Sequence, residues 1–279
     1  MLLLLTVFAF KVYAVDIVKL QLQQYSKNKA AHNSDVIQRA LEITEPEYGE
    51  FDLQQVEITM SGGRMIHSGL SGKLVNTLIL PGNAKWDKQH IAIRIPIRLG
   101  LLSYRLLLIN KADLSKFEKI NTLQEVKNLT AGLTNYWETT KIFKQDGYKV
   151  METGHFNGLF LMLDKHRFDY LPRSIYEIYA ELDARKDRLE NVVIEPTIAL
   201  NIPMLSYVYV SPSEPRIAKR IKSGLQKLIA NGELKELLYK HYGEDITRAN
   251  LPGRKIFTIE NNYYNHDANE YKNYLLYSK

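Results

Sequence analysis

The chain has 279 residues, of which 45% are hydrophobic and 24% are charged, and these are ordinary proportions for a folded globular protein. Its 37 Lys and Arg exceed its 31 Asp and Glu, so the net charge is +6, a mild excess. The densest basic cluster, within residues 216–222, is typical of one solvated helix face, so the composition argues against a nucleic-acid partner.

Residues 1–14 match the pattern of a secretory signal peptide. Residues 1–10, MLLLLTVFAF, are nearly all apolar but too few to span a bilayer, which takes about 20 residues. Val12-Tyr13-Ala14 then provides the small residues of a cleavage site. A buried first strand or an uncleaved anchor is the alternative. Cleavage would release the protein, from residue 15 onward, into the periplasm of a Gram-negative cell.

The sequence contains no cysteine. This excludes a disulfide framework, thiol catalysis and lipid attachment through cysteine. A chain without thiols is also compatible with an oxidising compartment such as the periplasm.

Short apolar runs alternate with amphipathic segments along the rest of the chain. We expect strands at residues 15–22, 51–59, 75–80, 91–95, 101–109, 129–133, 148–152, 169–171, 192–195 and 205–210. We expect helices at residues 34–44, 60–74 and 123–127, from 136, from 157, at 174–186 and from 213, the last broken at Gly232. Ser34 and Ser213 are the expected N-caps of two of these helices. Strands that alternate with helices predict an α/β fold with mostly parallel sheets, followed by a Tyr- and Asn-rich tail over residues 252–279.

No catalytic or metal-binding motif stands out. The seven histidines include no pair spaced i, i+4, which excludes an HExxH zinc helix, and no GxSxG sequence is present. The glycine-rich stretch at residues 62–74 ends in Gly-Lys-Leu, where a phosphate-binding loop needs Ser or Thr to hold magnesium. The carboxylates Glu177, Glu181 and Asp183 are expected on a solvated helix face. The sequence therefore predicts no enzyme activity, no metal and no cofactor.

Several segments resemble one protein family in the same order along the chain. Residues 218–243, AKRIKSGLQKLIANGELKELLYKHYG, are similar to the C-terminal helix signature of extracellular solute-binding protein family 3. Further segments resemble this family or a degenerate branch of it, at residues 94–105, 123–132, 160–169 and 167–174. Over about residues 15–245, the chain thus resembles a divergent member of this amino-acid-binding branch of the type II periplasmic binding proteins.

The resemblance implies two α/β lobes, each a mixed and mostly parallel sheet flanked by helices. Two crossover strands, expected near residues 102–104 and 204–206, would form the hinge. The first lobe would hold residues 15–103 and 204–279, and the second would hold residues 104–203. A ligand would lie between the lobes and become buried when the hinge closes.

The resemblance also places three segments at this cleft, the first of them at Asn83 and Trp86. Amino-acid binders of the family carry Thr-x-x-Arg there, and Trp86 takes the place of the arginine. Trp86 could stack on a ring of the ligand, or it could pack between structural elements. The second segment is the expected helix start at Thr134, Asn135 and Tyr136, where free backbone N–H groups favour an anion. Ordinary helix capping is the alternative there.

The third segment contains Arg173 and Ser174. The family often has an aspartate at this place, which pairs with the amino group of the ligand. An arginine would reverse the preference, from an ammonium group toward a carboxylate or phosphate. The alternative is an arginine that pairs with Glu177, one helical turn further on. Two landmarks of α-amino acid binding are therefore substituted.

The leading hypothesis is a monomeric periplasmic solute-binding protein. It would capture a small polar, anionic molecule for an ABC-type importer or a membrane sensor. The alternative is a protein-interaction or signalling partner that has lost the amino-acid site. An enzyme on the same fold would need a compact set of titratable groups in the cleft, which the sequence does not assemble.

Overall fold

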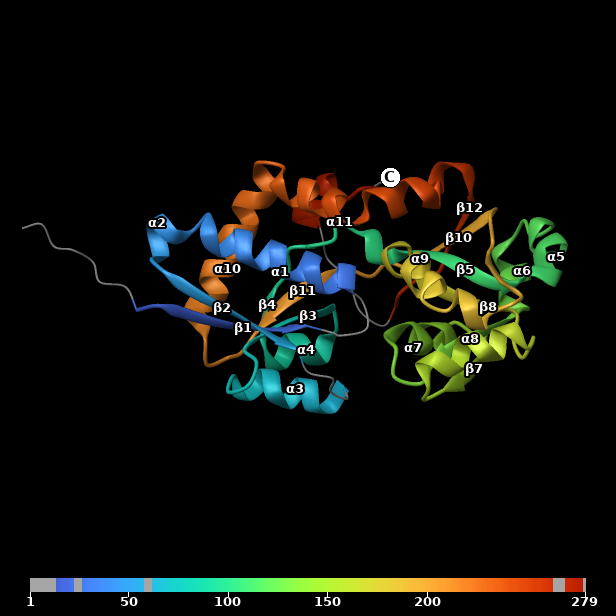
Figure 1. Ribbon diagram of the computed structural model, residues 1–279, viewed down its shortest axis with the longest axis horizontal. Coiled ribbons are helices and arrows are strands. Elements are labelled where there is room, and N and C mark those ends of the chain that lie inside the picture. The colour runs from blue at the N-terminus through green and yellow to red at the C-terminus, as the bar shows by residue number, and fades with distance from the viewer. Residues whose placement is uncertain (1–13, 23–26, 58–61, 263–268, 278–279) are drawn as a thin grey trace, which may run out of the picture.

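The computed structural model describes residues 14–22, 27–57, 62–262 and 269–277. The predicted signal peptide lies outside these residues, except for its last one, Ala14. The described chain forms two lobes side by side along the long axis of the molecule (Figure 1). Each lobe has its own β-sheet, and helices cover both faces of each sheet.

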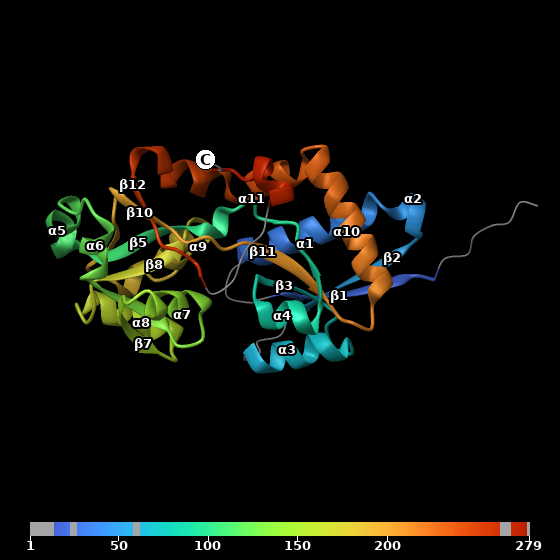
Figure 2. The same ribbon diagram turned by 180° about the vertical axis from the view of Figure 1, so that it is seen from behind.

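The first lobe is built on a five-stranded sheet with the order β2-β1-β3-β11-β4. Its strands are β1 (Asp16–Leu22), β2 (Phe51–Glu57), β3 (Thr77–Pro81), β4 (Ile91–Ile93) and β11 (Ser206–Val210). Strand β1 runs parallel to β2 and β3, whereas β11 is antiparallel to β3 and β4. The helices of this lobe are α1 (Lys27–Glu42), α2 (Glu45–Tyr48), α3 (Gly62–Ser71), α4 (Ala84–Gln89) and α10 (Pro215–Ala230). Helices α1 and α10 lie on one face of the sheet, and α3 and α4 lie on the other (Figures 1 and 2).

The second lobe is built on a seven-stranded sheet with the order β12-β10-β5-β8-β6-β7, in which β9 also pairs with β5. Its strands are β5 (Tyr104–Asn110), β6 (Thr130–Thr134), β7 (Lys149–Thr153), β8 (Tyr170–Ser174), β9 (Val192–Ile194), β10 (Ile198–Asn201) and β12 (Lys255–Thr258). Its helices are α5 (Leu114–Glu118), α6 (Leu123–Lys127), α7 (Glu138–Gln145), α8 (Phe156–Asp164) and α9 (Ile175–Asp183). Short 3-10 turns occur at Leu101–Ser103, Lys111–Asp113, Lys186–Arg188, Leu251–Gly253 and Asn269–Tyr274.

Two crossover segments connect the sheets, from the end of β4 to β5 and from β10 to β11, and the chain enters the second sheet once more at β12. The two crossover segments are tied together at Ser103, whose hydroxyl donates to the carbonyl of Met204 (2.9 Å) and accepts from the Met204 amide (3.0 Å). The expected two-lobed α/β fold with mixed sheets is thus confirmed.

Helix α11 (Glu233–Ala249) runs along the side where the lobes meet and packs on α1, α10 and α9 (Figure 1). The chain then enters the second lobe as β12 and returns to the hinge. There the Leu276 amide donates to the carbonyl of Leu99 (3.0 Å), and the hydroxyl of Tyr104 donates to the carbonyl of Tyr277 (2.9 Å). The expected surface tail is therefore hydrogen-bonded to the first crossover segment.

Two strands were missed by the sequence interpretation, β10 and β12. Each has four residues. The expected boundaries assigned residues 204–279 to the first lobe. Because β12 pairs in parallel with β10, its four residues instead extend the second sheet.

Two expected helix starts and one expected strand end were also displaced. Helix α1 begins at Lys27, and Ser34 lies inside it, where its hydroxyl accepts a hydrogen bond from the Gln55 side chain (2.7 Å). The N-cap of α10 is Glu214, so Ser213 does not cap it. Pro172 does not end its strand but pairs with Leu107 inside β8. The Leu107 carbonyl accepts a hydrogen bond from the Glu195 amide. Strand β5 therefore needs no N–H donor at position 172, where proline has none.

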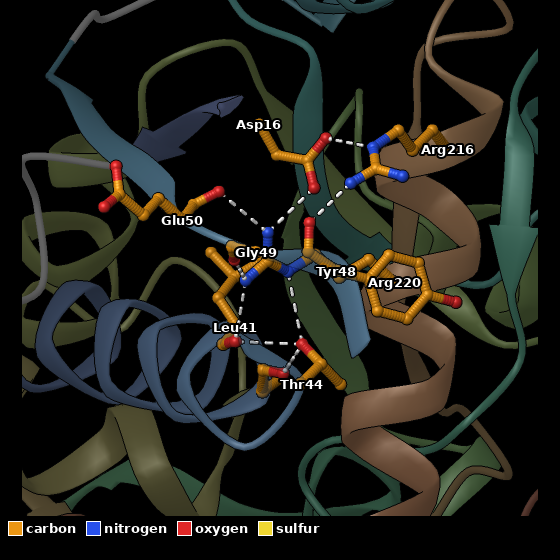
Figure 3. A network of polar contacts seen from close by, with 9 residues as sticks. Asp16, Leu41, Thr44, Tyr48, Gly49, Glu50, Arg216 and Arg220 are labelled. Atoms are coloured by element: carbon orange, nitrogen blue, oxygen red, sulfur yellow. Dashed lines mark hydrogen bonds and ion pairs between the residues drawn. The ribbon is translucent and has the colours of Figure 1, made fainter. Parts of the chain in front are cut away.

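A buried ion pair anchors β1 to α10 in the first lobe (Figure 3). Arg220, which is fully buried, donates to the carboxylate of Asp16 over 2.8 Å and also to three backbone carbonyls. Arg216 reaches the other oxygen of the same carboxylate, also over 2.8 Å. Since these groups connect β1, the α1–α2 region and α10, they fix the outer end of the first lobe.

Candidate functional site

A cluster of charged side chains is buried where the two lobes meet. It consists of Lys29 on α1, Arg98 in the first crossover, Arg105 on β5, Arg173 on β8, and Glu177 and Glu181 on α9. The three arginines are only 2%, 4% and 6% exposed, respectively. The Lys29 ammonium lies 3.9 Å from Glu177 and so joins the first lobe to the second.

Arg173 is held by the two carboxylates of α9. Its Nε and Nη2 donate to Glu181 over 2.6 and 2.5 Å, and Nη2 also lies 3.0 Å from Glu177. The guanidinium packs 4.5 Å from the ring centroid of Trp137. Although burial lowers the pKa of Arg173, Glu177 and Glu181 together raise it above its usual value. The ion pair considered as the alternative role of Arg173 is therefore present.

The expectation that Glu177 and Glu181 lie on a solvated face is wrong. Both side chains are 13% exposed, because this side of α9 packs toward the lobe junction. Burial raises the pKa of Glu177, but the surrounding cations, Arg173 foremost and then Lys29, lower it below its usual value. Glu177 is thus a carboxylate surrounded by cations. Asp183, at the end of the helix, is exposed as expected.

Arg98 and Arg105 have no carboxylate within ion-pair distance in the described part of the chain. Arg98 donates to the side chain of Asn33 and lies 5.0 Å above the ring of Tyr176. Among the described residues, the acceptor of Arg105 is the Met204 sulfur, over 3.6 Å. The Nε atoms of both arginines are buried and find no acceptor among the described residues. Burial lowers the pKa of Arg105 below its usual value, although the charge of Glu177 acts in the opposite direction.

These two arginines were not identified as site residues from the sequence. Each is a single cation inside an apolar run, PIRLGLL for Arg98 and YRLLLI for Arg105. Such an arginine is buried only if it is paired or bound, so this pattern was the signal that could have revealed them.

The residues expected at the first segment of the cleft lie in and before α4. Asn83 is the N-cap of this helix, and its side chain accepts from the Lys85 amide over 2.8 Å. Trp86 is partly buried, with its ring 6.3 Å from that of Tyr209 and 5.7 Å from that of His90. Asn83 therefore has a capping role and Trp86 a packing role within the first lobe.

The other expected site residues belong to the second lobe. Helix α7 begins at Glu138, so Thr134, Asn135 and Tyr136 precede it by a turn, and the expected helix start is displaced. Thr134 is fully buried and its hydroxyl has no partner among the described residues, whereas Tyr136 is 59% exposed. Asn135 is exposed as well. Ser174 is fully buried and donates to the carbonyl of Leu101 over 3.3 Å.

No family model matches the chain, and no curated protein sequence matches it either. Solved structures do. An ancestral arginine-binding protein bound to glutamine is 13% identical, with a TM-score of 0.56 over 83% of this chain and 100% of that one. A mutant of ArgBP from T. maritima is 16% identical, with a TM-score of 0.55 over 81% and 95% of the two chains.

A third similar structure is the GluR0 ligand-binding core from Nostoc punctiforme in complex with L-glutamate, at 15% identity and a TM-score of 0.52, over 81% of this chain and 98% of that one. The chain has the type II periplasmic binding protein fold. The charged cluster lies at the junction of the two lobes, where the sequence resemblance led us to expect a ligand. Within the described ranges there is no group of three metal-binding side chains and no helix that could cross a bilayer.

One titratable residue lies beside the cluster without a hydrogen bond. His32 on α1 is fully buried, and neither ring nitrogen has a partner in the described part of the molecule. Its ring lies 5.2 Å from that of Tyr242 and 5.6 Å from that of His241, both on α11. Burial, then the charge of Arg98 and the neighbouring His241, hold the pKa of His32 well below 6.5.

Acidification is expected to destabilise the type II fold through His32. The folded protein keeps this histidine neutral, whereas the unfolded chain binds a proton as the pH falls below about 6.5, so proton binding lowers the free energy of the unfolded state relative to the folded one. The resulting loss of stability, present below about pH 6.5, amounts to at most about 1.4 kcal/mol per pH unit.

Urea unfolding of the wild type and of His32→Leu between about pH 5 and pH 7.5 measures this loss. The free energy of unfolding of the wild type should fall relative to that of the variant as the pH decreases. Burial raises the pKa of Asp245 to about 6, which acts in the opposite direction, but the comparison of two proteins cancels its contribution. A difference that does not vary with pH would contradict the prediction.

Proposed function

We propose that this chain is a monomeric solute-binding protein of the Gram-negative periplasm. It captures a small polar molecule that carries negative charge and presents it to an ABC-type importer or a membrane sensor, without catalysing a reaction. The observation that carries the proposal is the buried positive charge at the lobe junction of a ligand-binding fold. Solved proteins of this fold are described as bound to glutamine and to glutamate, and as taking part in glutathione import in Streptococcus mutans.

In this proposal both lobes contact the ligand when the hinge closes. The first lobe contributes Asn83 and Trp86, and the second contributes Thr134, Asn135, Tyr136, Arg173 and Ser174. The buried hydroxyl of Thr134, which lacks a partner in the described part of the chain, is a hydrogen-bonding group available to a ligand. Arg173 would act through its electrostatic field, since its Nε and Nη2 donors are occupied by Glu181 and Glu177.

A thermal-shift screen of residues 15–279 tests the proposal. The panel holds amino acids, organic acids, sugars, nucleotides and polyamines. A solute that binds only the folded state stabilises it by about 2.7 kcal/mol at 100 times its Kd, which is readily seen as a rise in Tm. We expect at least one anionic solute to produce such a rise. A cooperatively folded protein with no response to any class would contradict the proposal.

The second candidate function is that of a protein-interaction or signalling partner. It is favoured by the occupied donors of Arg173 and by the presence of Trp86 at the place where the family has its ligand-binding arginine. Adjacent genes for a sensor kinase, with no permease or ATPase genes beside them, would favour this candidate over transport.

A further inference from the structure

The charges of the junction cluster do not balance. Its four cations are Lys29, Arg98, Arg105 and Arg173, and its two carboxylates are Glu177 and Glu181. Four positive charges less two negative ones leave an excess of two, and every one of these groups is at least largely buried. A buried charge without a counter-charge is costly, so a protein retains one where something else supplies the opposite charge.

The excess lies on Arg98 and Arg105, and Arg105 is the less well satisfied of the two. Arg173 has two carboxylates and Lys29 has Glu177. Arg98 donates to the amide oxygen of Asn33, whereas the acceptor of Arg105 among the described residues is the sulfur of Met204. A thioether is a weak acceptor, so this contact satisfies a guanidinium poorly. The Nε of Arg105 has no acceptor at all among the described residues.

The Met204 sulfur occupies a place that suits an oxyanion better. The hydroxyl of Thr139, in the first turn of α7, also lies 3.9 Å from this sulfur. The guanidinium of Arg105 and the hydroxyl of Thr139 therefore both donate to the sulfur of Met204. Methionine is unbranched and flexible, so its side chain can leave this place at little cost.

We propose that Arg105 and Thr139 bind an oxyanion of the ligand in the place that the Met204 sulfur now fills, and that the ligand carries two negative charges, which neutralise the cluster. The inference rests on the proposed function, since it names the binding group and the charge of its solute. Carboxylates and phosphate esters share this chemistry. The position of Met204 in the second crossover couples the arrival of the anion to the hinge.

The first test needs no ligand. Met204→Glu places a carboxylate beside Arg105, and Met204→Gln is its neutral match. If the site lacks an anion, the glutamate variant should have the higher Tm at about pH 7.5, by about 2–4 °C, and the advantage should vanish on acidification. A glutamate variant that melts below the glutamine variant would overturn the proposal.

The second test measures binding. Calorimetry compares C3–C6 dicarboxylates, their monoamides and phosphate monoesters on the wild type, on Arg105→Met and on Arg248→Met. Arg248 is 46% exposed and lies outside the cluster, so its variant removes the same charge as a control. We expect a dianion to bind the wild type and the control alike, and Arg105→Met to bind it about 100-fold more weakly while melting no lower than the wild type.

The outcomes separate the two proposals. Binding of neutral or cationic solutes alone, or of a monoamide as tightly as its dicarboxylate, would overturn this inference and leave the solute-binding function in place. An Arg105→Met variant that melts well below the wild type would assign Arg105 a structural role and overturn the inference as well. A protein that binds no solute of any class would overturn both.

Discussion

Replacement of Arg220 by methionine is expected to destabilise the protein by about 3–5 kcal/mol, because it leaves the buried carboxylate of Asp16 without its buried counter-ion. Asp16 is only 6% exposed and relies on Arg220 for its buried hydrogen bond. The Arg220 guanidinium also donates hydrogen bonds to other oxygens (Figure 3), namely the Thr44 hydroxyl and the carbonyls of Leu41, Gly49 and Glu50. Methionine fills much of the volume but can serve none of these oxygens.

Arg216→Met is the matched control for this prediction. Arg216 contacts the same carboxylate over 2.8 Å, but its side chain is 43% exposed, so water can replace its hydrogen bonds. We expect its loss to cost about 1 kcal/mol or less. Urea unfolding followed by circular dichroism gives both free energies. Equal losses for the two variants would show that burial of Arg220 is not the source of the effect.

Substitution of Gly224 by alanine is expected to cost about 3 kcal/mol, because α10 and α1 approach each other at this glycine. A Cβ atom there would lie 2.1 Å from the carbonyl oxygen of Ala40, which is backbone in the last turn of α1. The two helices would have to move apart, and their buried leucine and isoleucine contacts would loosen. Glycine to alanine usually stabilises a helix, so a loss of stability here would identify the close approach of the two helices as the cause.

Gly243→Ala, in α11, shows this opposite sign. A Cβ at Gly243 would lie 3.5 Å from the ring of Tyr239, which is ordinary van der Waals contact. Alanine is the better helix former, so we expect a gain of about 0.5–1 kcal/mol. Thermal unfolding of both variants beside the wild type measures the contrast. If both alanines stabilise, the close approach of α1 and α10 at Gly224 is refuted.

The two-lobed architecture could be anticipated because it depends on patterns that are local in sequence. Apolar runs and amphipathic helices alternate clearly, and the segments that resemble the solute-binding family occur in its order. Helix starts were less predictable: Ser34 has the chemistry of an N-cap, yet α1 begins at Lys27 and the Ser34 hydroxyl instead accepts a hydrogen bond from the Gln55 side chain. Strands β10 and β12, of four residues each, were missed.

The charged cluster could not be assembled from the sequence, because its members come from five separate segments of the chain. Glu177 and Glu181 follow Arg173 on consecutive helical turns, a pattern that a solvated helix shares. Their burial depends on α1 and on the crossovers, which lie elsewhere in the sequence. Arg98 and Arg105 gave the stronger signal, as lone cations in apolar runs, but the neighbouring sequence does not show which residues they contact in the fold.

The late position of β11 and β12 in the chain has a consequence for the order of folding. Strand β11 lies between β3 and β4 in the first sheet, and β12 forms the edge of the second, although both follow nearly all of the second lobe in sequence. A nascent chain therefore cannot finish either lobe until its last quarter has been synthesised. Contacts between such distant residues slow folding, and they make it improbable that one lobe persists when the other unfolds. The molecule should melt as one cooperative unit, and a shortened chain that ends before β11 should leave β3 and β4 without the strand that joins them.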